Sequence, residues 1–180
     1  MARPSAQPLV VALGSNLGNR LGNLCLAVHE LEKSGIRVGP VSSVFETPPA
    51  GFLDQPPFLN MVALASTHLP PRRVLSIFQS VEEHAGRSRA FPNSPRTLDL
   101  DLLFFSDWIV RDAGLSVPHP RWKGRSFVVR PLEEVLPRHR DPETGWTVQE
   151  VARFWPIEPK EIQMVASPMA FARALKEWKE

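Results

Sequence analysis

The sequence of 180 residues contains no tyrosine and a single cysteine, Cys25. One thiol cannot form a disulfide within the chain and fits a reducing compartment, so we expect a cytoplasmic protein with Cys25 as an inert core thiol. No apolar run approaches the roughly 18 residues of a membrane-spanning helix. Residues 1–8 also lack the apolar stretch of a secretory signal. These absences predict no membrane partner.

An excess of one charge sign is also missing, since 21 basic and 19 acidic side chains leave a formal net charge of only +2. That balance does not indicate a nucleic-acid partner, which usually requires a strongly basic face. Hydrophobic residues make up 43% and charged residues 22%, which excludes general disorder. Proline is in excess, with 19 copies, and most prolines lie at joints between segments, where they stiffen loops.

Apolar periodicity predicts alternating strands and helices over the first 105 residues. Short β-branched runs predict strands, apolar residues three and four apart predict helices, and Gly, Pro and Asn mark the breaks. The expected elements are a strand over 9–13, a helix over 21–31, strands over 36–45 and 58–65, a helix over 71–85 and a strand over 98–105.

This order of elements predicts an α+β fold, the ferredoxin-like split β-α-β sandwich, in which helices pack on an antiparallel sheet. The fold hosts many functions and therefore identifies none. The remaining sequence predicts a helix over 128–135, a loop or small hairpin over 137–147, a short helix over 148–155 and an amphipathic tail over 168–179.

The segment 96–105, with the sequence RTLDLDLLFF, places two aspartates in an otherwise apolar strand. Residues two apart in a strand face the same side, so Asp99 and Asp101 direct two carboxylates to one place. The opposite, buried face is expected to hold Leu98, Leu100, Leu102 and Phe104. Close carboxylates repel each other unless a cation lies between them, and hard oxygen ligands select Mg²⁺ or Mn²⁺. The alternative is a solvated strand face with ordinary surface acids.

Basic residues flank this segment on both sides. Arg87, Arg89 and Arg96 precede the aspartates, and a second basic stretch, which includes one histidine, covers 119–125. Arginines beside a dicarboxylate metal site fit a polyphosphate ligand, whose charge must be neutralised along its length. The alternative is a solvated loop. Residues 14–18 (GSNLG) match neither a P-loop nor a dinucleotide-binding motif, so a strand-to-helix turn is favoured there.

Several motifs together resemble the 6-hydroxymethyl-7,8-dihydropterin pyrophosphokinase family of folate biosynthesis. They occur in the family's order and extend from residue 12 to about residue 132. The motifs that carry the resemblance are ALGSNLG at 12–18, TPP at 47–49 with Gly51, DQP at 54–56, FLN at 58–60, PRTLDLD at 95–101, and VPH at 117–119 with Arg125 and Phe127. The 95–101 motif is the most specific of them.

The resemblance implies an ATP-dependent diphosphokinase, which transfers pyrophosphate from ATP to the hydroxymethyl group of the dihydropterin and releases AMP. It implies ATP as co-substrate and two Mg²⁺ ions as cofactors. Small molecules are then the partners, with no nucleic acid, and a monomer is the starting expectation. We expect residues 1–180 to form a single pyrophosphokinase domain, with the motifs within about 9–135 and no readable motif in about 136–180.

The resemblance also implies roles for individual residues. Catalytic roles fall on Arg87, Arg89, Arg96, Asp99 and Asp101, and the two aspartates are the metal ligands. The ATP-binding set is Gln79, Glu82, Arg89, Arg96, Leu102, Ser116, His119 and Arg125. The pterin-binding set is Thr47, Pro48, Ala50, Phe58, Asn60 and Phe127. Asn60 can donate and accept hydrogen bonds at a ring edge, Phe127 offers a stacking face, and the loop over 86–95 is expected to act as a lid.

Two functions from other classes stay open. A binding module for RNA or a small effector would explain the fold but not the paired aspartates, and the sequence has no aromatic pattern typical of RNA-binding sheets. A two-metal phosphohydrolase would use water as the acceptor in place of the pterin. Mg²⁺-dependent turnover of ATP, with product analysis in the presence and absence of dihydropterin, separates these functions.

Overall fold

The computed structural model describes residues 5–86, 94–154 and 162–180. Its main sheet contains β1 (Gln7–Ser15), β2 (Ile36–Val41), β3 (Val44–Thr47), β4 (Phe58–Thr67), β5 (Asp99–Phe105) and β8 (Gln163–Ala166). These strands pair antiparallel in the order β5-β1-β4-β3-β8, and β2 also pairs with β4. A separate hairpin consists of β6 (Val110–Asp112) and β7 (Leu115–Val117).

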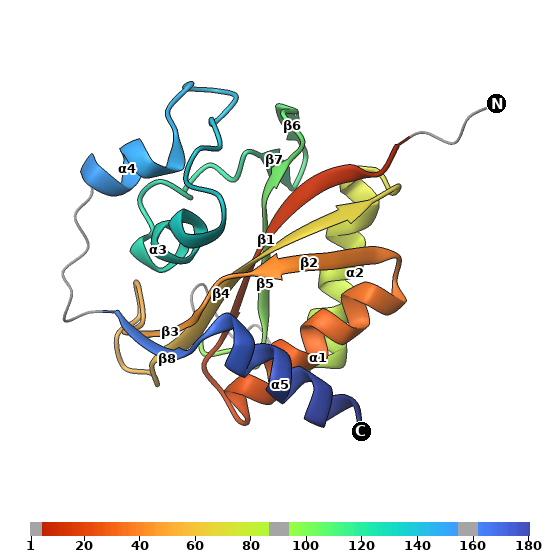
Figure 1. The fold of residues 1–180 in the computed structure, drawn as a ribbon, viewed down its shortest axis with the longest axis vertical. Helices are drawn as coiled ribbons and strands as arrows, with labels where there is room; N and C mark the ends of the chain where they lie inside the picture. The colour runs from red at the N-terminus through yellow and green to blue at the C-terminus, as the bar shows by residue number, and fades with distance from the viewer. Residues whose placement is uncertain (1–4, 87–93, 155–161) are drawn as a thin grey trace.

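Helices cover both faces of the main sheet (Figure 1). The first face carries α1 (Arg20–Lys33), α2 (Pro71–His84) and α5 (Pro168–Lys179), and the second carries α3 (Ser126–Val135) and α4 (Val148–Phe154). The antiparallel sheet with helices packed on it confirms the predicted α+β class. The strand order β5-β1-β4, followed by β2 and β3, is that of the ferredoxin-like split β-α-β arrangement. Within the described residues, no helix is long and apolar enough to cross a bilayer.

Local sequence explains the ends of the first helices. The side chain of Asn19 accepts a hydrogen bond of 3.0 Å from the backbone N–H of Gly22 and so caps α1. Gly35 follows the end of α1 with a φ of 86°, a conformation that favours glycine. Pro71 occupies the first turn of α2, where its missing N–H costs nothing.

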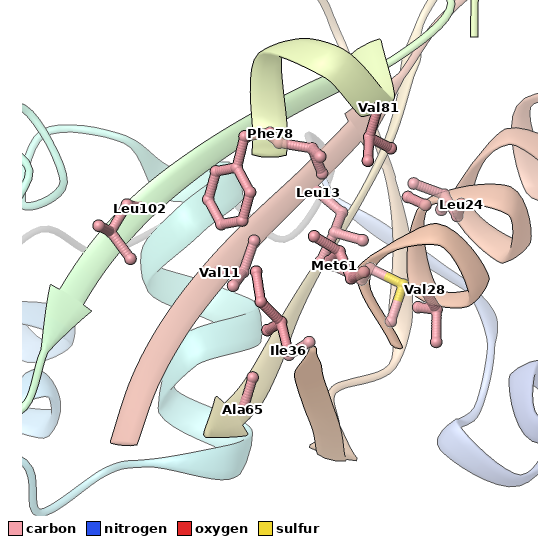
Figure 2. Packing of buried hydrophobic residues seen from close by; sticks show 14 of the residues in the cluster. Val11, Leu13, Leu24, Val28, Ile36, Met61, Ala65, Phe78, Val81 and Leu102 are labelled. Carbon is pink, nitrogen blue, oxygen red and sulfur yellow. The ribbon is translucent and has the colours of Figure 1, made fainter. Parts of the chain in front are cut away.

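An extended cluster of apolar side chains fills the core between the sheet and its first helical layer (Figure 2). Leu24 and Val28 of α1 and Phe78 and Val81 of α2 face the sheet residues Val11, Leu13, Met61 and Leu102. Cys25 belongs to this cluster, and burial raises the pKa of its thiol, which keeps the reactive thiolate scarce. Because these side chains pack on the first face of the sheet, the alternate side chains of each strand point to the second face.

The strand expected over 36–45 is in fact two strands. The pairing of β2 with β4 shifts register between Val38 and Val41, around Gly39 and Pro40. Pro40 has no N–H to donate to the ladder, so the chain bends before β3 begins. The strands β6, β7 and β8 were not predicted, because each is only three or four residues long.

The prediction that Phe104 shares the buried face of Leu100 and Leu102 is wrong. A register shift between Val10 and Val11 leaves Leu103 as an extra residue in β5, which reverses the alternation beyond it. Phe104 therefore packs in a second cluster, under α3 and α4 and on the same side of the sheet as Asp99 and Asp101.

This second cluster covers only part of its face of the sheet. Its buried members are Val10, Val62, Leu103, Phe104, Trp122, Val128, Val129, Leu132, Val148 and Val151. The chain beyond α3 contributes to both clusters, because Val148 and Val151 lie in the second and Phe171 of α5 lies in the first. The adjoining ends of β1, β4 and β5 on this face are left for the functional site described below.

We predict that His139 makes the stability of the fold depend on pH. Its ring lies 4.4 Å from that of Phe104, and its Nε2 is buried with no hydrogen-bond partner in the described structure. Burial lowers the pKa of His139 and outweighs the attraction of Asp141, which acts in the opposite direction. The unfolded chain therefore binds the proton first as pH falls below about 6.5, and the free energy of unfolding falls by up to about 1.4 kcal/mol per pH unit for this group.

The measurement is urea unfolding between pH 7.5 and 5.0 on the wild type and on His139→Phe. The variant retains an aromatic ring but cannot titrate, so its free energy of unfolding should fall less steeply below pH 6.5. Parallel pH profiles for the two proteins would contradict this role of His139.

Candidate active site

A cavity of about 250 Å³ opens where the second cluster ends. Strands β1, β4 and β5 form its floor, and the loops after β3 and before α3 form its walls. It is lined by Ala12, Leu13, Gly14, Thr47, Pro48, Ala50, Gly51, Phe58, Asn60, Met61, Arg96, Asp99, Asp101, Arg121, Gly124, Arg125, Phe127 and Val128. The lining combines aromatic faces, one buried carboxamide, two carboxylates and three arginines.

One row of residues across three strands determines the floor of the cavity. Gly14 of β1 pairs with Asn60 of β4 on one side and with Asp99 of β5 on the other. A Cβ atom placed on Gly14 would lie 2.9 Å from Asn60 Oδ1 and 3.8 Å from Asp99 Cβ. Glycine is therefore needed to leave room between the carboxamide and the carboxylate.

The carboxamide of Asn60 is held in place. Its Nδ2 donates a hydrogen bond of 2.8 Å to Thr47 Oγ1, and both residues are buried. A buried carboxamide has more donors and acceptors than this one bond uses. This end of the cavity can therefore recognise a polar, flat ligand edge, with Phe58 and Phe127 as apolar faces in the same lining.

Arginines accompany both carboxylates. Arg96 Nε lies 3.4 Å from Asp99 Oδ2, and Arg125 donates a hydrogen bond of 2.6 Å to Asp101 Oδ2. The same guanidinium groups lie over aromatic rings, at 5.5 Å from the centroid of Phe58 for Arg96 and at 5.6 Å from that of Phe127 for Arg125. The carboxylate end of the cavity thus holds two negative and two positive groups in close contact.

His119 lies beside the same cluster, with its Nε2 3.8 Å from Asp101 Oδ2. Burial lowers the pKa of His119, and the charges of Arg125 and Arg121 add to this effect, whereas Asp101 opposes it. The neutral imidazole is therefore favoured, and its Nδ1 accepts a hydrogen bond of 3.1 Å from the backbone N–H of Arg121. His119 thus shapes the start of the loop that carries the arginines.

The chemistry of this donor set fits Mg²⁺. Asp99 and Asp101 project from the same side of β5, with about a quarter to a third of each side chain exposed. Among the described residues, no group of three or more His, Cys, Asp or Glu side chains could hold a metal ion. Two carboxylates therefore leave most coordination positions to other oxygens, which is the usual way that Mg²⁺ binds together with substrate phosphates.

Asn16 connects three parts of the site. Its side chain donates to Gln55 Oε1 at 2.9 Å and to the carbonyl of Pro56 at 3.1 Å, and it accepts from the backbone N–H of Arg96 at 2.8 Å. The backbone N–H of Asn16 also donates to the carbonyl of Arg96. One buried residue after β1 therefore ties the loop before β4 to the residues before β5.

The structure brings most of the site residues expected from the sequence into one place. Those that line the cavity are Thr47, Pro48, Ala50, Phe58, Asn60, Arg96, Asp99, Asp101, Arg125 and Phe127. Arg87 and Arg89 lie outside the described residues.

Five other expected nucleotide-side residues do not line this cavity, and one of them, His119, lies beside it, with its Nε2 3.8 Å from Asp101 Oδ2. The side chain of Leu102 is buried in the first core cluster, Gln79 is exposed on α2, and Ser116 lies on β7. Glu82 is buried, and its Oε1 accepts a hydrogen bond of 2.7 Å from the backbone N–H of Leu100. In this structure Glu82 therefore contacts the backbone of the aspartate-bearing strand.

The sequence alone did not assign Gly14, Met61, Gly124 or Val128 to the site. Gly14 was interpreted as part of a turn, and only its pairing partners show why it must lack a side chain. Arg121 belonged to the expected basic stretch without a role of its own. The signal for Gly14 was present, since a glycine in an otherwise apolar strand often marks a close approach.

Comparisons with known proteins show which family and fold the chain is similar to. A family model described as 7,8-dihydro-6-hydroxymethylpterin-pyrophosphokinase (HPPK) matches residues 10–137. The 2-amino-4-hydroxy-6-hydroxymethyldihydropteridine pyrophosphokinase of Bacillus subtilis is 40% identical over 147 residues, which cover 81% of this chain and 88% of that protein.

Larger proteins also match. The mitochondrial folate synthesis bifunctional protein of Pisum sativum is 41% identical over 138 residues, 77% of this chain, and the folic acid synthesis protein fol1 of Pneumocystis carinii is 36% identical over 142 residues, 79% of this chain. The chain spans only 27% and 19% of the lengths of these two relatives. The crystal structure of Plasmodium falciparum HPPK-DHPS with pterin and p-hydroxybenzoate has a TM-score of 0.72 at 15% identity, over 89% of this chain and 46% of that one, a likeness of fold.

We predict that Asn16→Ala loosens the loop before β4. The change leaves the backbone N–H of Arg96 and the carbonyl of Pro56 without this partner, and we expect the free energy of unfolding to fall by about 2 kcal/mol. Limited proteolysis should then cut within 52–57 faster than in the wild type. Asn19→Ala is the matched control, since it removes only the cap of α1 and should leave the cleavage rate of that loop unchanged. Equal cleavage rates in wild type and Asn16→Ala would contradict the connecting role.

Proposed function

The chain belongs to the 7,8-dihydro-6-hydroxymethylpterin-pyrophosphokinase family, and from this membership we propose that it transfers pyrophosphate from ATP to 6-hydroxymethyl-7,8-dihydropterin. The products would be AMP and the pterin pyrophosphate, an intermediate of folate biosynthesis. The observation that carries the proposal is one cavity with two ends. A buried Thr47–Asn60 pair lies at one end, and Asp99 and Asp101 lie with arginines at the other.

The carboxamide end suits the pterin. A pterin ring presents donors and acceptors on the same edge, and Asn60 can satisfy both kinds because Thr47 fixes its orientation. Phe58 and Phe127 offer apolar faces to the flat ring. Gly14 keeps the space between Asn60 and Asp99 open, so the hydroxymethyl group of a bound pterin would point toward the carboxylates.

The carboxylate end suits the nucleotide phosphates. Asp99 and Asp101 would hold two Mg²⁺ ions, which would neutralise phosphate charge and favour attack at the β-phosphorus. Arg96 and Arg125 pair with these aspartates in the structure, so phosphate oxygens would compete for the same guanidinium donors. Arginine suits this role because its planar fork binds two oxygens and stays charged at neutral pH.

The proposed step balances as a single transfer. The hydroxymethyl oxygen attacks the β-phosphorus of ATP, the bond between that phosphorus and the bridging oxygen of the α-phosphate breaks, and AMP leaves. The hydroxyl proton passes to solvent or to a phosphate oxygen, since positioning and charge stabilisation dominate phosphoryl chemistry. We propose that Arg96, Arg121 and Arg125 stabilise the negative charge that develops on the leaving AMP. Arg87 and Arg89 stay predicted lid residues.

We further propose that residues 1–180 act as one pyrophosphokinase domain, because α5 and the residues of α4 pack into the same clusters as the motif-bearing strands. A cytoplasmic location, a monomeric state and the absence of a nucleic-acid partner stay predictions. The single buried thiol of Cys25 is consistent with a reducing compartment.

The function is tested by the nucleotide product. With ATP, Mg²⁺ and 6-hydroxymethyl-7,8-dihydropterin, we expect AMP and pterin pyrophosphate in equal amounts, and little turnover without the pterin. Chromatography of the reaction mixture distinguishes the possible enzymes: ADP would indicate an ordinary kinase, and inorganic phosphate released without pterin would indicate a phosphohydrolase. Asp101→Asn is the negative control, and its turnover should fall by at least about 100-fold, the scale of losing one preorganised electrostatic group.

The pterin end is tested by two variants with different mechanisms. Asn60→Ala removes the carboxamide and should weaken pterin binding by about tenfold, since it leaves ring groups unpaired. Gly14→Ala keeps the carboxamide but forces it to move, because the new Cβ would lie 2.9 Å from Asn60 Oδ1. Calorimetry with α,β-methylene-ATP and Mg²⁺ at saturation should show weaker pterin binding in both. The affinity of both variants for the nucleotide analogue should stay within about twofold of the wild-type value. An equal loss of affinity for both ligands would contradict a pterin site at Asn60.

A further inference from the structure

A buried carboxylate lies in the turn between α3 and α4, a part of the sequence without a recognisable motif. Asp141 is only 1% exposed, in a turn closed by an isolated bridge between Arg140 and Thr147. Charged side chains are rarely so buried unless they are paired. The partners of Asp141 therefore indicate what the turn holds in place.

Two of these partners belong to the loop that forms a wall of the cavity. Asp141 Oδ2 accepts a hydrogen bond of 3.3 Å from the indole Nε1 of Trp122 and forms an ion pair with the ammonium group of Lys123. Its Oδ1 accepts a hydrogen bond of 2.8 Å from the backbone N–H of Glu143, within the turn. One carboxylate thus fastens the turn to the middle of the loop over 119–125.

The same loop presents cations to the cavity. Arg121, Gly124 and Arg125 line the cavity on either side of Trp122 and Lys123. Trp122 is fully buried, and its ring packs edge-on against Phe104 of β5, with the centroids 5.3 Å apart. The two anchoring residues, Trp122 and Lys123, thus lie between residues that line the cavity.

Other contacts attach the loop directly to β5, among them the hydrogen bond from Arg125 to Asp101. At its start, the backbone N–H of His119 donates to the carbonyl of Leu103 at 2.9 Å. Within the loop, the backbone N–H of Arg125 donates to the carbonyl of Trp122 at 3.3 Å, so the position of Trp122 is transmitted to Arg125. Without Asp141, the indole N–H would be buried without this acceptor and the ammonium of Lys123 would lose its counter-charge.

We propose that Asp141 is a positioning residue, which holds the 119–125 loop so that Arg121 and Arg125 face the phosphates of the nucleotide. This inference rests on the proposed function, because it takes the polyphosphate of ATP to be the anionic ligand of these arginines. It gives the turn between α3 and α4 a part in the reaction, although the turn does not itself line the cavity.

A charged anchor suits this turn. Burial alone would raise the pKa of Asp141, but the ammonium group of Lys123 and the N–H of Glu143 more than compensate, so the pKa is lowered and the carboxylate stays ionised at neutral pH. The ammonium group of Lys123 points toward the turn, because Lys123 Nζ contacts the carboxylate of Asp141.

The proposal predicts a selective defect. Thr47 and Asn60 lie on β3 and β4 and bond to each other, so the pterin end should not depend on the anchor. Calorimetry with α,β-methylene-ATP and Mg²⁺ should show that Asp141→Ala binds the nucleotide at least about tenfold more weakly, the scale of losing one charge-assisted hydrogen bond. Pterin affinity at saturating nucleotide analogue should change by less than about twofold. Asp141→Asn, which keeps an acceptor of the same shape, should recover part of the nucleotide affinity.

The matched control is Glu150→Ala. Glu150 Oε2 accepts from the backbone N–H of Thr147 at 2.7 Å and from its hydroxyl at 2.8 Å, so the change weakens the start of α4 in the same segment and spares the contacts to Trp122 and Lys123. It should lower stability and leave nucleotide affinity unchanged. If Asp141→Ala does not fold, Trp122→Phe keeps an aromatic ring near Phe104 but loses the N–H donor and part of the indole, and it should reproduce the selective loss of nucleotide affinity.

Three outcomes would overturn the proposal: unchanged nucleotide affinity in Asp141→Ala, equal weakening of both ligands, or the same weakening in Glu150→Ala. The proposed function is judged separately, on the wild type. If the wild type binds neither the nucleotide analogue nor the pterin, the proposed function is wrong. If the wild type binds both, the variants of Asp141 test its positioning role independently of the proposed function.

Discussion

The register of β1 between β4 and β5 is the constraint on which the site depends. β1 is hydrogen-bonded along both edges, and its alternation sends Val11 and Leu13 to the first core cluster and Val10, Ala12 and Gly14 to the other face. A slip of one residue in such a pairing exchanges the two faces of a strand. The apolar face therefore fixes the register, and that register places Gly14 between Asn60 and Asp99. Core packing and the geometry of the site thus have the same origin.

The two faces of the sheet differ because their helical layers differ in extent. On the first face α1 and α2 cover the strands with a continuous apolar cluster (Figure 2). On the second, α3 and α4 cover one part, and polar residues occupy the adjoining ends of the strands. The register shift at Val10 and Val11 lets β5 serve both parts, since it turns Phe104 into the second cluster beyond Asp101. A bulge at the edge of a site is a common way to redirect a strand in this manner.

Much of this arrangement could be predicted from the sequence, because it depends on short-range patterns. The alternation in 98–105 predicted that Asp99 and Asp101 share a face, and the order of strands and helices predicted the sheet. The bulge at Leu103 could not be predicted, since it depends on the pairing of β5 with β1. Short strands such as β8 were missed for a similar reason, because a segment of four residues becomes a strand only when β3 lies beside it. The role of Gly14 also required its two neighbours across the sheet.

The electrostatics of the site explain why its key groups are spread over the chain. Two carboxylates on one strand repel each other. Arg96, from the residues before β5, and Arg125, from the loop before α3, form ion pairs with them and offset this repulsion. Neither arginine belongs to β5 itself, since Arg96 precedes the strand and Arg125 lies in the loop before α3, so each is held by structure of its own. Asn16 contacts the backbone of Arg96, and Trp122 links Arg125 to the turn that contains Asp141. Asn16 and Trp122, which are far from the aspartates in sequence, therefore help to hold the arginines, and short-range patterns in the sequence did not assign either of them to the site.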